Sequence, residues 1–274
     1  MRYLNSMLLL VLLWLPNVGR ATAQEPDLLL YQGDTLLLQA NPLEQWLELL
    51  PKRPAEFRAV SSTACWRSYQ ATWQLEDKQL YLLRVVPCAA ENPEPIDLRR
   101  WFVPDAQGRV AATWVTGRLA VALGNVLCYE PLGYTTIYER DWLLTLRQGQ
   151  LTQQQIFDNQ SCRHCGMPAG QALAEQVYQA IDWHQVPRQQ GQAYCLVVVK
   201  FQPDSTGHSS QITLVKKAGW PYDSLASVAA RTLAAGEWGA CYRFGRWLPY
   251  SWSVPVRFSE ANRQRYYRRR QPRR

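Results

Sequence analysis

The sequence predicts an α+β fold made of two units, and three observations support this prediction. Between residues 24 and 157, short apolar runs alternate with turn residues, as is typical of antiparallel strands. Between residues 170 and 259, two helical patterns are interspersed with three strand-like runs. A polar stretch at 158–169, with Cys and Pro, indicates a linker. We therefore expect a β-rich antiparallel domain with one short helix, and then a domain with helices packed on a three-stranded antiparallel sheet.

The first 23 residues have the pattern of an export signal. Arg2 precedes the apolar run Met7–Leu15, and the small residues Ala21, Thr22 and Ala23 follow. Nine helical residues reach about 13 Å, which is too short for a bilayer core of roughly 30 Å. We expect cleavage after Ala23 and a mature chain that is periplasmic and has no transmembrane span; an uncleaved anchor is the alternative.

The net charge of +8 is unevenly distributed. Seven arginines and no acid lie in the last twelve residues, and Arg2 and Arg20 belong to the signal segment. The remaining body is close to neutral. We expect residues 260–274 to be a disordered basic tail that could touch anionic surfaces, and nucleic acid is not expected as the partner of an exported protein.

The N-terminal unit begins with a predicted hairpin over 28–31 and 35–39. A helix is expected to follow, with Asn41 as its N-cap, Pro42 in its first turn and Glu44 closing a capping box. The turn residues after it indicate a curved antiparallel sheet or an open barrel. The predicted strands are 69–75, 79–86, 109–115, 118–123, 126–130, 135–146 and 150–157.

Seven cysteines in an exported chain predict disulfides and one odd thiol. The hairpin of strands 69–75 and 79–86 brings Cys65 close to Cys88, so we expect this pair to be bonded. Cys195 and Cys241 fall within one C-terminal unit and are the second candidate pair.

Cys162 and Cys165 form a CxxC motif with His164 between them. A thiol pair of this kind could act in thiol–disulfide exchange, and a thiol–disulfide oxidoreductase is therefore the alternative function. The motif follows a polar stretch rather than a buried strand, which favours a structural or linker role. Four metal ligands at usual spacings are absent, so neither a metal site nor a cofactor is expected.

The segments STACWRSYQATWQLEDKQLYL and GYTTIYER resemble an uncharacterised domain of exported bacterial proteins. That resemblance implies no activity. Trp66, Arg67, Tyr134 and Glu139 could form a sugar- or peptide-binding face. The alternative is that the aromatic rings pack within the sheet and that the charges pair across strands.

The C-terminal unit has an αββαβ pattern. Helical spacing is seen at 171–183 and after Pro221, and strands are expected at 194–202, 210–217 and 248–258. The strand with Val197, Val199 and Phe201, the Asp204–Gly207 turn and the closing VPVRF segment resemble the C-terminal domain of the TonB energy-transducer family.

The resemblance to TonB implies a mode of binding. In that family the domain adds a strand from an outer-membrane partner to its sheet. The edge formed by Val254, Val256, Arg257 and Phe258 would then bind an envelope or outer-membrane protein through an extended peptide. The long spacer and the ionisable anchor of a transducer are missing, which argues against energy coupling.

Catalytic motifs are absent from the sequence. There are three histidines, and none lies at motif spacing from a carboxylate or a nucleophile. We therefore expect a non-enzymatic exported protein that acts in protein–protein interaction at the cell envelope, with a possible link to outer-membrane transport.

Overall fold

The computed structural model describes residues 23–58, 62–88, 94–164, 171–188, 193–209 and 211–267. The signal segment up to Thr22, the second part of the predicted linker from Cys165 to residue 169, and the last seven residues lie outside the described residues.

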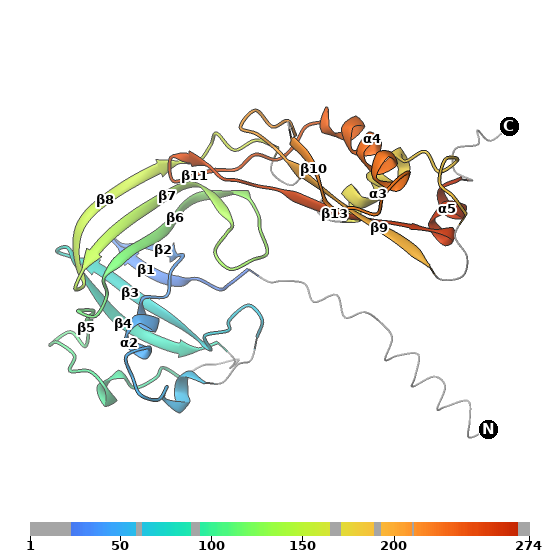
Figure 1. Cartoon of the computed structure of the whole chain (residues 1–274). Coiled ribbons are helices and arrows are strands. Elements are labelled where there is room, and N and C mark those ends of the chain that lie inside the picture. Colours follow the sequence, from blue (N-terminus) through green and yellow to red (C-terminus); the bar gives the residue numbers. More distant parts are fainter. Residues whose placement is uncertain are drawn as a thin grey trace, which may run out of the picture.

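Seven strands close into a barrel, drawn in blue to yellow-green in Figure 1. Around the ring the order is β1, β2, β6, β7, β8, β4 and β3, and β3 returns to β1. Six of the seven junctions are antiparallel, whereas β1 pairs with β3 in parallel, Leu29 opposite Trp73. The strands are β1 (Asp27–Tyr31), β2 (Asp34–Leu38), β3 (Tyr69–Glu76), β4 (Gln79–Pro87), β6 (Gly117–Cys128), β7 (Ile137–Arg147) and β8 (Gln150–Asp158). The short β5 (Val110–Ala111) pairs with β4.

Alternation along the strands fills the interior of the barrel. On β3, the inward residues are Tyr69, Ala71, Trp73 and Leu75, and all four are buried. A second group of aromatic residues packs against this core from α2 (Pro42–Leu47) and from the 3-10 turns η1 (Ala55–Phe57) and η2 (Leu98–Arg100) with the loops around them. These rings are Trp46, Phe57, Trp101, Phe102 and Trp114. Many of the tryptophan side chains therefore pack in or against the core of the barrel.

The C-terminal part contains a second, smaller sheet in the order β10, β9, β13. Its strands are β9 (Tyr194–Gln202), β10 (Gln211–Lys216) and β13 (Trp252–Ser259), and its helices are α3 (Gln171–Ala180), α4 (Tyr222–Ala234) and α5 (Glu260–Tyr267). Its core joins Leu173 and Val177 of α3 to Val197 and Phe258 of the sheet.

Between α4 and β13 the chain leaves this sheet and returns to the barrel. There it forms the small hairpin of β11 (Tyr242–Arg243) and β12 (Arg246–Trp247), which lies beside the barrel strands in Figure 1. Arg163 and Ala240 form an antiparallel bridge, and the Arg243 guanidinium binds buried Asp141 of β7. The two parts of the molecule therefore share buried polar contacts.

The predicted fold class is wrong. A curved antiparallel sheet or an open barrel was expected, but the parallel β1–β3 pairing closes the ring into a seven-stranded barrel that dominates the structure. Nor is the C-terminal part the self-contained, TonB-like domain of helices on a sheet. The physical reason is the β11–β12 excursion, which commits residues 240–247 to the barrel instead of to that sheet.

Several local predictions are confirmed and others need correction. The β1–β2 and β3–β4 hairpins form, as does the Cys65–Cys88 disulfide. Predicted strands 118–123 and 126–130 are one strand, because Gly124 and Asn125 form a bulge instead of a turn. The disordered tail was also predicted too early, since α5 runs to Tyr267 and buries Tyr266.

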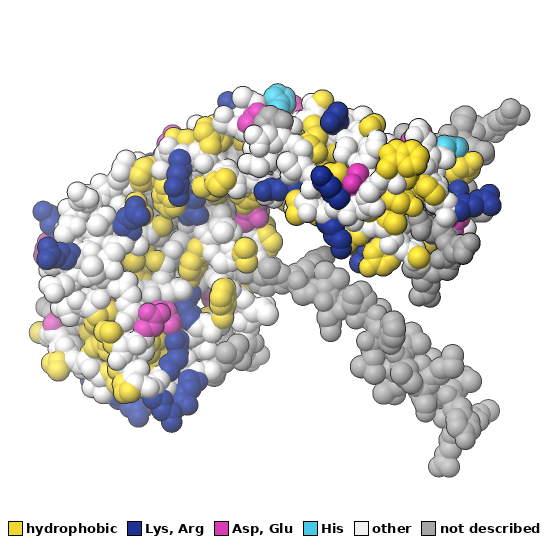
Figure 2. Space-filling view, in the orientation of Figure 1, with side chains coloured by type: hydrophobic (Ala, Val, Ile, Leu, Met, Phe, Trp, Pro, Cys, Tyr) yellow, Lys and Arg dark blue, Asp and Glu magenta, His cyan; other side chains and the backbone are white. Residues whose placement is uncertain are grey.

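Basic side chains do not gather in one patch on the face shown in Figure 2. Lys and Arg are spread over both the barrel and the C-terminal part. Within the described ranges, no helix combines the length and the apolar character that crossing a membrane requires.

Candidate functional site

A cavity of about 660 Å³ opens beside the start of β1 and the loop before β3. Residues from five separate segments line it, which brings together side chains more than 100 positions apart in the sequence. The lining residues are Gln24, Asn41, Glu44, Arg53, Phe57, Arg58, Trp66, Arg67, Ser68, Gly133 and Tyr134. Three of the four residues predicted to form a binding face, Trp66, Arg67 and Tyr134, lie here.

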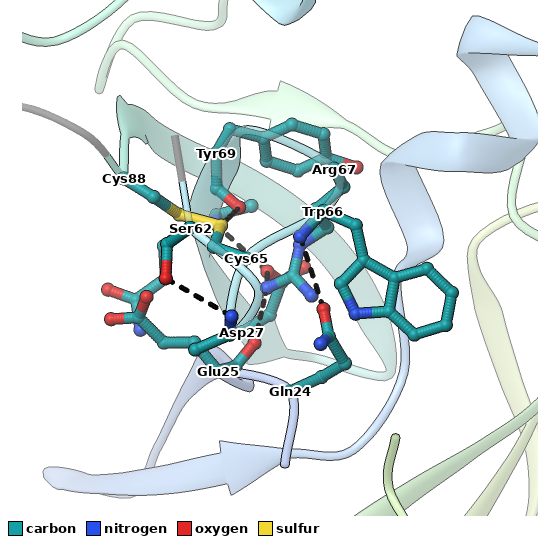
Figure 3. Close-up of a disulfide and its surroundings, with 12 residues drawn as sticks. Gln24, Glu25, Asp27, Ser62, Cys65, Trp66, Arg67, Tyr69 and Cys88 are labelled. Atoms are coloured by element: carbon teal, nitrogen blue, oxygen red, sulfur yellow. Dashed lines mark hydrogen bonds and ion pairs between the residues drawn. A yellow bond between two sulfur atoms is a disulfide. The ribbon is translucent and has the colours of Figure 1, made fainter. Parts of the chain in front are cut away.

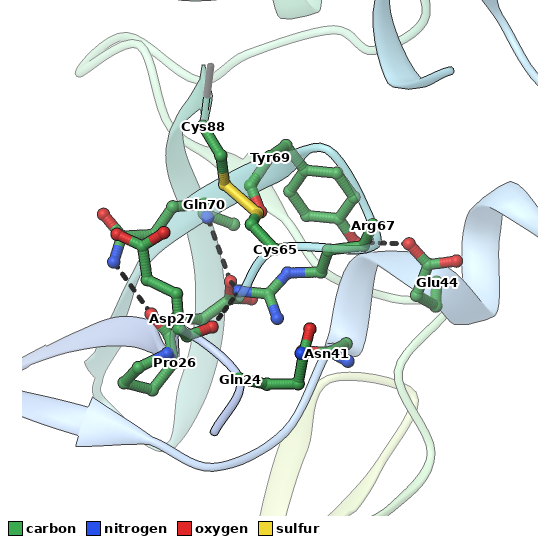
Figure 4. Close-up of polar contacts among 12 residues, drawn as sticks. Gln24, Pro26, Asp27, Asn41, Glu44, Cys65, Arg67, Tyr69, Gln70 and Cys88 are labelled. Carbon is green, nitrogen blue, oxygen red and sulfur yellow. Dashed lines mark hydrogen bonds and ion pairs between the residues drawn. A yellow bond between two sulfur atoms is a disulfide. The ribbon is translucent and has the colours of Figure 1, made fainter. Parts of the chain in front are cut away.

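A buried ion pair forms the floor of this region (Figure 4). Arg67 Nη2 lies 2.8 Å from Asp27 Oδ1, and the exposed fractions of the two side chains are 5% and 0%. Asp27 also accepts hydrogen bonds from the Ala71 N–H at 3.0 Å and from Trp73 Nε1 at 2.9 Å. Burial raises the pKa of Asp27 to about 6, although Arg67 and these donors favour its charged form.

Arg67 connects this pair to the wall of the cavity. Its Nη1 donates to the Tyr134 hydroxyl, which donates to Asn41 Oδ1 at 2.6 Å. Burial raises the pKa of Tyr134, so the phenol stays protonated. The Arg67 Nε–H is buried and has no hydrogen-bond acceptor among the described residues.

A second polar cluster adjoins this pair, since Arg53 Nη2 donates to the Arg67 carbonyl at 3.1 Å. Arg53 binds both carboxylate oxygens of Glu44, at 2.7 and 2.8 Å, and the Tyr69 hydroxyl donates to Glu44 at 2.9 Å. Arg53 also donates to the Phe57 carbonyl at 2.7 Å. The bidentate geometry fixes the orientation of both charged groups.

Trp66 provides the exposed aromatic surface. Its side chain points away from the Cys65–Cys88 disulfide in Figure 3, and the residue is 62% exposed. Gln24 Oε1 accepts a hydrogen bond from the Trp66 backbone N–H at 3.2 Å, which places an amide beside the ring. Arg58, which is exposed, donates its Nε–H to the Arg53 carbonyl at 2.7 Å.

Asn41 stands at the N-cap position of α2 and Pro42 lies in its first turn, as predicted, but the predicted capping box with Glu44 does not form. The α2 N-terminus has no side-chain cap, because Asn41 binds Tyr134 and Glu44 binds Arg53 and Tyr69. Glu139, the fourth residue of the predicted face, contacts Asn125 in the β6 bulge and does not line the cavity.

A metal site is not supported by the donor groups in this region. Glu25, Cys65 and Cys88 come close together, but the two sulfurs are bonded to each other and offer no thiolate.

The predicted docking edge is β13, and its geometry does not favour strand addition. Val254, Val256 and Phe258 are buried in the core. The Arg257 N–H donates to the Tyr178 hydroxyl at 2.7 Å, and Pro255 has no N–H to donate. Tyr178 of α3 therefore covers the outer edge of this strand.

The opposite edge, β10, carries two features that protect sheets from pairing with other strands. A register shift interrupts it between Leu214 and Lys216, and Lys216 and Lys217 follow. Neither edge of the small sheet is therefore an open template for a peptide.

The remaining cysteines are arranged differently from the prediction. Cys195 and Cys241 are both free thiols and do not pair. Cys195 lies opposite Phe258 at the far end of β13, whereas Cys241 packs beside Cys128 of the barrel. Cys162 is also free and lies in the same cluster as Cys241, and Cys165 lies outside the described residues.

Comparison with known proteins gives no match to a family model, a curated protein or a solved structure. The geometry of the chain itself therefore carries the functional argument.

Proposed function

We propose that the chain is a non-enzymatic, exported binding protein of the cell envelope, and that the cavity beside Trp66 is its binding site. The observation that carries this proposal is an exposed tryptophan above a wall of polar side chains that are already fixed by ion pairs and hydrogen bonds. Walls held in this way lose little entropy when a ligand binds.

The pairing of charges favours binding over catalysis. Asp27 is bound to Arg67, and Glu44 is bound to Arg53 and Tyr69, so the carboxylates near the cavity serve as structural anchors. A general base needs a carboxylate within reach of the substrate. Asp27 is completely buried beneath Arg67.

The chemistry of the lining favours an acidic saccharide. Trp66 offers an apolar ring face, on which the C–H face of a sugar can stack, and the amides of Gln24 and Asn41 suit sugar hydroxyls. Arg53 and Arg67 have acidic partners, whereas no ion pair within the described ranges involves Arg58. Arg58 can therefore bind a carboxylate on the ligand.

Calorimetric titration with oligogalacturonate and with its carboxyl-reduced, neutral counterpart tests this proposal. Trp66→Ala should weaken binding of both sugars about tenfold, a change of about 1.4 kcal/mol. Arg58→Ala should weaken binding of the acidic sugar alone.

Matched controls are available outside the cavity. Trp220 is 87% exposed and Arg99 has a 77% exposed side chain, and neither lines the cavity. Trp220→Ala and Arg99→Ala should therefore leave both affinities unchanged. Absence of binding, or equal losses for Trp66→Ala and Trp220→Ala, would reject the proposal.

A further inference from the structure

A second cluster of chemically reactive groups lies where the C-terminal part meets the barrel. Cys128 at the end of β6 and Cys241 before β11 are buried together with Ile137, and Cys162 packs against them. Cys128 is disulfide-bonded, whereas Cys162 and Cys241 are free thiols. Two thiols thus meet where two distant segments of the chain come together. The neighbouring contact, between the Cys162 sulfur and the Tyr242 carbonyl, joins residues 80 positions apart.

The backbone places these two thiols opposite each other. Arg163 and Ala240 exchange both of their backbone hydrogen bonds, at 2.9 and 3.0 Å, as a hydrogen-bonded antiparallel pair does. The next pair along is Cys162 with Cys241, at a non-hydrogen-bonded position. Such pairs have Cα atoms about 4.5 Å apart, with side chains on one face. Disulfides span Cα separations of about 4.4–6.8 Å.

The surroundings activate one of the two thiols. A hydrogen bond from Cys241 lowers the pKa of Cys162 to about 7, and the Tyr242 N–H, 3.1 Å from the Cys162 sulfur, adds to the effect. Thiolates are the nucleophiles of thiol–disulfide exchange. Cys162 is half-buried, so an oxidant can reach it, whereas Cys241 is buried.

We propose that Cys162 and Cys241 form a reversible disulfide that fastens the β11 segment to the barrel. The oxidant is a small-molecule disulfide. The Cys162 thiolate attacks one of its sulfurs and expels one thiolate, which leaves a mixed disulfide on Cys162. Cys241 then loses its proton and attacks the Cys162 sulfur, and the second thiolate leaves. The protein loses two hydrogens and the oxidant becomes two thiols.

The disulfide would act on the contact that joins the two parts. Arg243 lies two residues after Cys241 and donates to both carboxylate oxygens of Asp141, at 2.9 and 2.8 Å. A bond at Cys241 holds the start of this segment in place, so Arg243 and β11 would open less often in the oxidised protein.

Oxidation of the full mature chain by oxidised glutathione tests the proposal. Peptide mapping by mass spectrometry should find a Cys162–Cys241 cross-link, and trypsin should cleave after Arg243 and Arg246 several-fold more slowly than before oxidation. Cys195→Ser, which removes a free thiol elsewhere, should behave like the unaltered protein.

Variants of the pair complete the test. Cys162→Ser and Cys241→Ser should each abolish the cross-link and make the trypsin cleavage rate independent of oxidised glutathione. A bridge from Cys162 to Cys165 or to Cys128, or two thiols that remain open to alkylation after full oxidation, would overturn the proposal. An unchanged cleavage rate in a cross-linked protein would overturn the fastening role.

Discussion

Arg243 Nη2 lies 2.8 Å from Asp141 Oδ1, and this ion pair joins residues 102 positions apart in the sequence. The side chains are 9% and 0% exposed, and Asn159 donates a further hydrogen bond to the same carboxylate at 2.6 Å. The contact is therefore a buried one, in which the loss of either partner leaves a charge without compensation.

The first prediction concerns this pair. Arg243→Gln should lower the free energy of unfolding by about 3–5 kcal/mol, because Asp141 would remain buried without its cation. Urea unfolding followed by tryptophan fluorescence measures the change. Arg99→Gln makes the same substitution in the exposed Arg99–Asp97 pair and should cost less than about 1 kcal/mol. Equal losses in the two variants would show that the buried pair has no special role.

The second prediction concerns the covered edge of β13. Tyr178→Phe should lower the free energy of unfolding by about 0.5–1.5 kcal/mol, because the Arg257 N–H loses its acceptor. Thermal and urea unfolding measure this change. Tyr129 is 64% exposed, so Tyr129→Phe is the control and should be neutral. If Tyr178→Phe is equally neutral, the hydroxyl does not stabilise the edge.

Local pattern predicted much of the secondary structure and little of the closure. The β3–β4 hairpin and its disulfide follow from the alternation of apolar residues along two neighbouring strands that are joined by a short turn. The β1–β3 pairing joins Leu29 to Trp73 across the intervening α2 segment, and no local signal specifies such a partner. This parallel pairing closes the barrel, and because no local signal specifies it, the sequence predicted only a curved sheet or an open barrel.

The site was only partly predictable for a related reason. Trp66, Arg67 and Tyr134 were candidates because of their residue types. Asn41 and Glu44 have local sequence contexts that fit helix capping equally well. Their actual partners, Tyr134 and Arg53, are set by tertiary packing. The pairing of Cys195 with Cys241 failed similarly, since membership of one segment says nothing about the β11 excursion.

The third prediction concerns the turn between β7 and β8. Gly149 has a φ of +77°, and a Cβ there would lie 2.6 Å from the Ala112 carbonyl oxygen. Gly149→Ala should therefore lower the free energy of unfolding by more than about 2 kcal/mol.

Gly33, in the β1–β2 turn, has a φ of +93° and open space around it. Gly33→Ala should cost about 1–2 kcal/mol, the strain alone. A smaller loss at Gly149 than at Gly33 would contradict the crowding argument. Urea unfolding measures both.

The fourth prediction concerns the pH dependence of stability. Burial raises the pKa of Asp27 from 3.8 to about 6 in the folded chain. At a pH between these two values, the Asp27 carboxyl keeps its proton in the folded chain but has lost it in the unfolded chain. The contribution of Asp27 to stability is therefore greatest below about pH 4 and falls as the pH rises to about 6. A difference of about two pKa units corresponds to about 3 kcal/mol.

Asp27→Asn isolates this contribution, because asparagine does not titrate. The free energy of unfolding of both proteins would be measured in urea from pH 4 to pH 7, so that the other carboxylates cancel in the difference. The unaltered protein should lose about 3 kcal/mol relative to the variant across this range, with most of the change below pH 6. A gain relative to the variant as the pH rises would mean that the attraction of Arg67, 2.8 Å away, outweighs burial, and that the folded-state pKa of Asp27 lies below its unfolded value.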